Sequence, residues 1–104
     1  MDKFMINFLY ALIGALLVNC IPHLVQGLSG NPFQTPFATP PGVGESSALI
    51  NLYWGMFNLM AGYGLLRYAG LFKLGMNAKT ISLLVGGFIL ATYLAVHFEQ
   101  VRHP

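Results

Sequence analysis

Two histidines are the side chains of this 104-residue chain that are best suited to chemistry. His23 directly follows Pro22, and His97 lies near the C-terminal end. Neutral imidazole is a common ligand for metal ions and for haem iron, so one hypothesis is a metal or haem site at His23 and His97. The alternative is that each ring is hydrogen-bonded within the protein at a membrane interface. Their separation in the sequence matches no specific ligand motif.

The other reactive side chains give no support for catalysis. The apolar stretches contain no acid and no lysine, and no serine or cysteine has a base close to it in the sequence. Cys20 is the single cysteine, which excludes a disulfide within the chain and a multi-cysteine zinc site. We therefore expect a protein that is not an enzyme and that carries no cofactor, apart from the histidine hypothesis.

A stripe of polar and small residues recurs at helical spacing in the middle of the chain. Its members are Ser47, Asn51, Gly55, Asn58 and Gly62. Intervals of four, four, three and four place them on one helix face. Asn58 lies near the centre of an apolar stretch, where an unpaired amide would cost several kcal/mol, so it needs a partner. The stripe predicts either helix packing, within the chain or with a second copy, or the wall of a polar path.

Three apolar windows without a charged residue position these side chains. Charged residues make up 8% of the chain and hydrophobic residues 56%, whereas a soluble domain has about 25% charged residues. The windows cover Phe4–Ile21, Ala48–Leu66 and Ile81–Phe98, each near the roughly 20 helical residues that cross a bilayer. The sequence therefore predicts an all-α integral membrane protein with one membrane domain, 1–104, and three transmembrane helices. Small residues on the first and third helices favour close packing there as well, at Asn7, Ala11, Gly14, Gly87, Ala91 and Ala95.

The basic residues predict how the helices are oriented. Four of the five fall on one side of the predicted membrane domain, and one falls on the other: Lys3, Arg67, Lys73 and Lys79 against Arg102. Cytoplasmic segments retain Lys and Arg, so we expect the N-terminus and the 67–80 loop in the cytoplasm. The C-terminus would lie outside a bacterial-type inner membrane.

The outer loop, 27–46, is unusually neutral for a segment that water could reach. Prolines recur at 32, 36, 40 and 41, the Pro-Phe pair occurs twice, and Glu45 is the one charged residue. Proline rules out a long helix or a central strand, so an extended segment with turns at its glycines is expected. A long loop with aromatic residues and little charge favours a lid or docking surface on the outer face. The alternative is a loop that lies in the lipid headgroups.

These features predict a non-enzymatic membrane protein that acts as a homo-oligomer or as an accessory subunit of a membrane complex. A transporter or channel for small solutes is an alternative that uses the polar stripe, and metal or haem binding is a second one. The expected partners are the lipid bilayer and a second copy or another membrane protein. Nucleic acid is excluded, because a net charge of +2 from scattered basic residues makes no binding surface.

Overall fold

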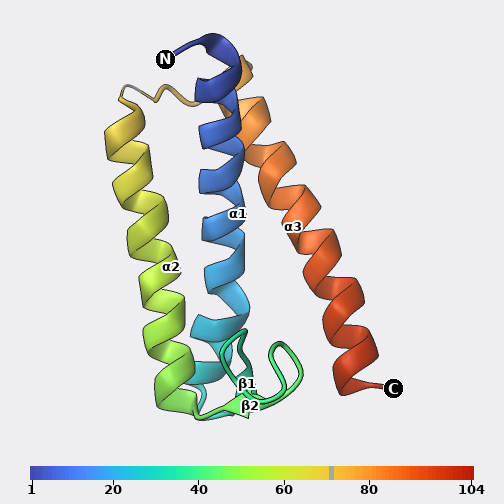
Figure 1. Ribbon diagram of the computed structural model, residues 1–104. Coiled ribbons are helices and arrows are strands. Elements are labelled where there is room, and N and C mark those ends of the chain that lie inside the picture. Colours follow the sequence, from blue (N-terminus) through green and yellow to red (C-terminus); the bar gives the residue numbers. More distant parts are fainter. Residues whose placement is uncertain (71) are drawn as a thin grey trace.

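The computed structural model describes residues 1–70 and 72–104, which form three long helices and one small hairpin (Figure 1). The elements are α1, Lys3–Leu28; β1, Phe33–Gln34; β2, Glu45–Ser46; α2, Ala48–Ala69; and α3, Ala78–Arg102. The chain is thus all-helical apart from the hairpin, as the apolar windows predict. Leu71, inside the predicted 67–80 loop, lies outside the described residues.

Each helix begins at a residue that caps its first turn. Asp2, Ser47 and Asn77 precede α1, α2 and α3, and each side chain accepts a hydrogen bond from the backbone N–H three residues further on, at 2.8, 3.3 and 2.9 Å. Such caps satisfy amide groups that the helix itself leaves free. Helix α2 ends before Gly70, whose φ of 96° is in the region that favours glycine. Capping residues therefore fix where the helices start.

The helices extend beyond the predicted spans. Helix α1 continues through Pro22 as far as Leu28, and α3 runs from Ala78 to Arg102. The window length reflects the thickness of the hydrocarbon core, whereas a helix can continue into the interface, where its backbone bonds remain favourable. Two further turns of α1 bring His23 inside the helix and shorten the loop that follows it.

Helix α1 is the central element of the bundle. It packs against both α2 and α3, whereas α2 and α3 barely touch each other over the described residues (Figure 1). The backbones of α1 and α3 are in direct contact where Gly14 faces the carbonyl of Leu83 and Gly86 faces the carbonyl of Ala11. Glycines let helix backbones approach closely, which is how helices associate where water supplies no hydrophobic drive.

The loop between α1 and α2 folds back under the bundle. Strands β1 and β2 pair antiparallel, with Phe33 opposite Ser46. The turn between them is closed by the carbonyl of Thr35, which accepts from the backbone N–H groups of Ala38 and Gly42 at 3.3 and 2.9 Å. Gly42 has a φ of 73°, which a side chain would disfavour. The loop is therefore a folded cap at the helix ends (Figure 1).

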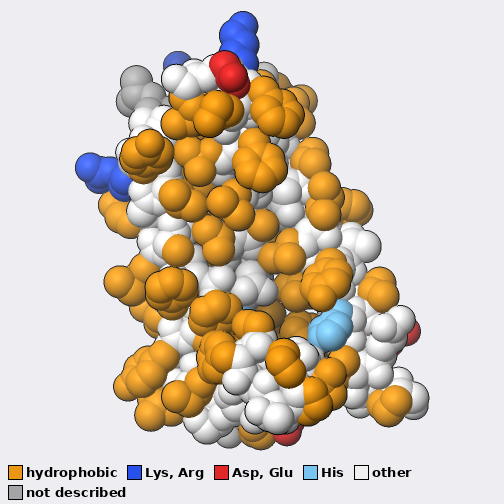
Figure 2. Space-filling view, viewed as in Figure 1, with side chains coloured by type: hydrophobic (Ala, Val, Ile, Leu, Met, Phe, Trp, Pro, Cys, Tyr) orange, Lys and Arg blue, Asp and Glu red, His pale blue; other side chains and the backbone are white. Residues whose placement is uncertain are grey.

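The outer surface of the bundle is apolar. Within the described residues, α1 and α3 are long and apolar enough to cross a membrane. Large hydrophobic side chains are exposed along all three helices, and they cover most of the face shown in Figure 2. The Lys and Arg side chains visible there lie toward the end that holds the N-terminus. A surface of this kind suits lipid contact.

Substitution of two glycines by alanine tests the contact between α1 and α3. A Cβ on Gly86 would overlap the Ala11 backbone, so Gly86→Ala should lower the free energy of unfolding in mild detergent by about 1–3 kcal/mol. The control is Gly64→Ala, because a Cβ there meets nothing within 4 Å and should gain up to about 1 kcal/mol of helix propensity. Equal melting temperatures of the two variants would contradict the contact.

Candidate functional site

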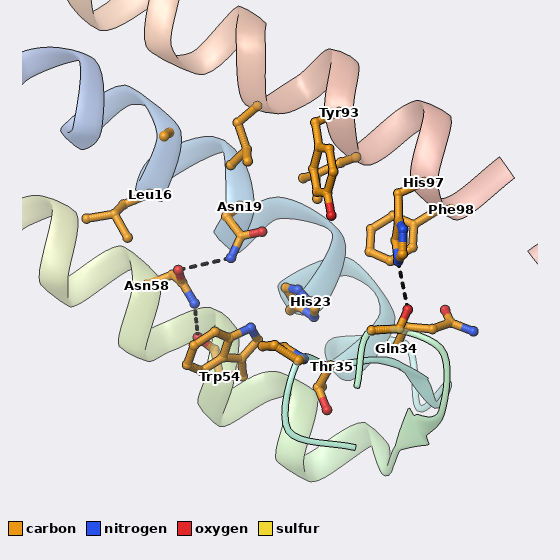
Figure 3. A pocket seen from close by; sticks show the side chains of 15 residues that line it. Leu16, Asn19, His23, Gln34, Thr35, Trp54, Asn58, Tyr93, His97 and Phe98 are labelled. Carbon is orange, nitrogen blue, oxygen red and sulfur yellow. Dashed lines mark hydrogen bonds between the residues drawn. The ribbon is translucent and has the colours of Figure 1, made fainter. Parts of the chain in front are cut away.

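A cavity of about 320 Å³ lies where the three helices meet the folded loop (Figure 3). It opens because α2 and α3 do not close against each other on this side of α1. The lining residues include Ala15, Leu16, Asn19 and His23 of α1; Gln34, Thr35 and Gly42 of the loop; Trp54 and Asn58 of α2; and Leu90, Tyr93, Leu94, His97 and Phe98 of α3. Among the residues that the structure describes, no Asp, Glu, Lys or Arg lines it.

The loop is fixed to the helices by one buried amide, that of Asn51 on α2. This side chain has no exposed surface. Its Nδ2 donates to the backbone carbonyls of Phe33, Ser46 and Ser47 at 3.0, 3.0 and 3.1 Å, and thus binds both β-strands. Its Oδ1 lies 2.7 Å from Nδ1 of His23 on α1. A single side chain therefore joins α1, α2, β1 and β2.

This arrangement determines which nitrogen of His23 carries the proton. Because the Asn51 Nδ2 group is directed at three carbonyls, Oδ1 must be the atom that faces His23. Nδ1 of His23 therefore donates, and Nε2 of the neutral ring is an acceptor. The ring is 2% exposed and lines the cavity, and Nε2 has no hydrogen bond to any residue that the structure describes.

Helix α3 holds the opposite side of the loop. His97 Nε2 donates to the carbonyl of Gly42 at 2.8 Å, as Figure 3 shows. Arg102 donates to Gln34 Oε1 at 2.9 Å and lies 4.7 Å from the centre of the Phe33 ring. These contacts join residues more than fifty positions apart. The loop is therefore clamped between the C-terminal ends of α1 and α3 and the N-terminal end of α2.

A second polar contact lies deeper in the bundle, between α1 and α2. Asn19 Nδ2 donates to Asn58 Oδ1 at 3.0 Å, and Asn58 Nδ2 donates to the backbone carbonyl of Trp54 at 2.8 Å (Figure 3). Both polar atoms of Asn58 are thus satisfied within the chain, as a buried amide in an apolar environment requires. Asn19 keeps its own carbonyl oxygen, Oδ1, as an acceptor at the cavity.

Trp54 presents a buried donor without a partner at the cavity wall. Its Nε1 is buried and has no hydrogen-bond partner in the part of the chain that the structure describes. The indole is held between Phe37, edge-on at 5.3 Å, and Phe57, stacked at 5.7 Å. The His23 ring stands edge-on to it at 6.4 Å. A buried indole N–H normally has a hydrogen-bond partner, so this atom is an exception to that pattern.

The structure brings most of the residues singled out in the sequence to this region. Asn51, Gly55, Asn58 and Gly62 of the stripe are buried, the two glycines against Leu24 and Leu17 of α1, while Ser47 caps α2. The stripe thus faces α1 of the same chain, and an interface with a second chain would have to lie on another face. Association with a second chain stays a prediction.

The two histidines line the same cavity. Each already uses one nitrogen, His23 for Asn51 and His97 for Gly42. Among the described residues, no group of three or more His, Cys, Asp or Glu side chains could hold a metal ion. The metal or haem hypothesis stays a prediction. Three contributors were not singled out for this site in the sequence: Trp54, Phe33 and Arg102.

Comparisons of the chain with protein families, with curated proteins and with solved structures find no match. The chemistry of the site therefore follows from its own residues. An uncharged cavity with aromatic walls and a few convergent polar groups is the usual form of a small-molecule site. Its polar groups include a buried donor, Trp54 Nε1–H, two acceptors, His23 Nε2 and Asn19 Oδ1, and the hydroxyl of Tyr93, which can donate or accept.

Replacement of Asn51 tests its role as the anchor of the loop. Asn51→Ala removes the side-chain donor from the carbonyls of Phe33, Ser46 and Ser47, which should cost about 1–3 kcal/mol and speed proteolysis within 29–47. The matched control is Asn31→Ala, since Asn31 is an exposed residue of the same loop. Cleavage rates in detergent measure the effect, and equal rates for both variants would show that Asn51 does not hold the loop.

Proposed function

We propose that this chain is a three-span membrane protein that binds a small uncharged molecule from the bilayer and does not act on it chemically. The topology is that expected from the sequence: the N-terminus in the cytoplasm, the loop and the C-terminus outside, in a bacterial-type inner membrane. The observation that carries the proposal is the cavity under the loop, which is uncharged and contains a buried donor with no partner, Trp54 Nε1–H.

Helix α2 is the third span of this proposal, and the burial of its polar residues supports that assignment. Helix α2 has 22 residues, enough to cross a core of about 30 Å at about 1.5 Å per residue. Asn51 and Asn58 lower its average hydropathy, yet both face α1. Its outward face carries Tyr53, Phe57 and Met60, all exposed. The surface offered to lipid is therefore as apolar as that of its neighbours.

Cysteine labelling tests the topology. In a Cys20→Ala background, a membrane-impermeant maleimide added to intact cells should label Ser29→Cys and His103→Cys. It should label Met76→Cys only after permeabilisation, because the link between α2 and α3 would be cytoplasmic. All three positions are exposed, Met76 at 95%, so access is limited by the membrane alone. Labelling of Met76→Cys in intact cells would overturn the topology.

The types of side chain that line the cavity support binding without catalysis. The lining side chains are apolar, aromatic or neutral polar, which suits an uncharged ligand. Cys20, the one thiol, donates instead to the backbone carbonyl of Leu17 at 2.9 Å, away from this lining. The clamped loop would keep water from the ligand at the outer end of the cavity.

Filling the cavity tests the binding proposal. Wild-type protein purified in mild detergent should release an uncharged compound on solvent extraction, near one molecule per chain by mass spectrometry. Ala15→Leu fills part of the cavity and should reduce that yield at least severalfold, whereas Ala95→Leu, at an exposed position of α3, should not. Equal yields from the two variants, or no compound from the wild type, would remove the proposal.

A further inference from the structure

The polar groups of the cavity are complementary in a way that specifies the functional group of a ligand. Trp54 Nε1 can only donate a hydrogen bond. Nε2 of His23 can only accept one while the ring is neutral. Figure 3 shows the indole nitrogen on the edge of Trp54 that faces His23. A hydroxyl is the smallest organic group that both accepts and donates. One hydroxyl between these rings would satisfy both nitrogens.

Both rings are held in place before any ligand arrives. His23 is fixed through Asn51, and Trp54 through Phe37 and Phe57. Neither nitrogen can turn toward another partner without breaking these contacts. A donor and an acceptor that are held rigidly in an apolar wall favour ligands that match both, because an unmatched buried polar group costs free energy.

The polar and apolar side chains of the cavity wall are separated along the length of the bundle. Its hydrogen-bonding groups gather at the end covered by the loop, near His23 and His97. About two helical turns further toward the middle of the bundle, the wall consists of Ala15, Leu16 and Leu90. A bound molecule would therefore have its polar group near the outer interface and its apolar part toward the centre of the membrane. Lipids and other membrane amphiphiles adopt this orientation.

We propose that the ligand is an uncharged lipid alcohol, that is, a membrane amphiphile whose polar group is a hydroxyl. Its oxygen accepts from Trp54 Nε1–H and donates to His23 Nε2, and its chain lies along Leu16 and Leu90. This inference rests on the proposed function and names the ligand class for the same cavity. A charged headgroup is disfavoured, because no Lys, Arg, Asp or Glu lines the cavity to pair with it.

The single tryptophan of the chain reports on the site directly. Bromine quenches tryptophan fluorescence on contact, so brominated probes of equal heavy-atom number can be compared in phosphatidylcholine nanodiscs. The probes carry bromine beside the polar end, where it would contact Trp54: 2-bromohexan-1-ol, which donates and accepts; 2-bromo-1-methoxypentane, which only accepts; and 2-bromoheptane, which does neither. The alcohol should quench Trp54 saturably, at a mole fraction about tenfold lower than the ether, since the ether leaves His23 Nε2 unpaired.

A variant with the fluorophore on the lipid face serves as the control. In Trp54→Phe/Phe57→Trp the tryptophan replaces a ring that is 61% exposed and does not line the cavity. Its quenching should rise linearly with all three probes, as contact with bulk lipid requires. The variant keeps an aromatic ring at both positions, so the bundle should be retained.

The outcomes separate this inference from the proposed function. Saturation by all three probes at the same mole fraction would leave the cavity as a binding site but overturn the alcohol. Absence of saturable quenching by any probe would contradict the proposed function as well. Saturation by 2-bromoethanol equal to that by 2-bromohexan-1-ol would assign the ligand to the aqueous phase and overturn the lipid chain.

Discussion

The need to hydrogen-bond every polar group of a backbone removed from water governs this structure. The irregular loop between α1 and α2 carries carbonyls outside regular helices, and the Asn51 side chain, which has no exposed surface, donates to those of Phe33, Ser46 and Ser47. The same amide orients His23. The fold of the loop, the tautomer of the histidine and the polarity of the cavity wall therefore all depend on one residue of α2.

The sequence predicts the helices and the need of buried polar side chains for hydrogen-bond partners. It does not predict which residues those partners are. A charge-free apolar window predicts a helix, and a central Asn58 predicts a hydrogen bond. That its partner is Asn19 depends on which faces of α1 and α2 meet, and small residues on all three helices allow several pairings. The position of α1 between α2 and α3 likewise follows from tertiary contacts at Gly14 and Gly86.

The candidate site was predictable only in outline. The sequence singled out both histidines as candidate ligands, and both line the cavity. The contacts of Arg102 with Gln34 and of His97 with Gly42 span most of the chain and leave no local pattern. The unpaired Trp54 N–H is harder still to predict from the sequence, because the lack of a hydrogen-bond partner is a property of the folded protein. An indole near the end of a span looks in the sequence like an ordinary interfacial anchor.

In the proposed three-span topology, the buried stripe of α2 affects how the chain enters the membrane. Helices α1 and α3 are apolar enough to partition into lipid individually, whereas α2 alone would carry two uncompensated amides into hydrocarbon. Asn58 finds its partner on Asn19, and Asn51 finds one on His23, both in the helix synthesised just before it. Helices α1 and α2 would therefore insert together as a hairpin during biogenesis, with α3 docking afterwards on the glycine face of α1.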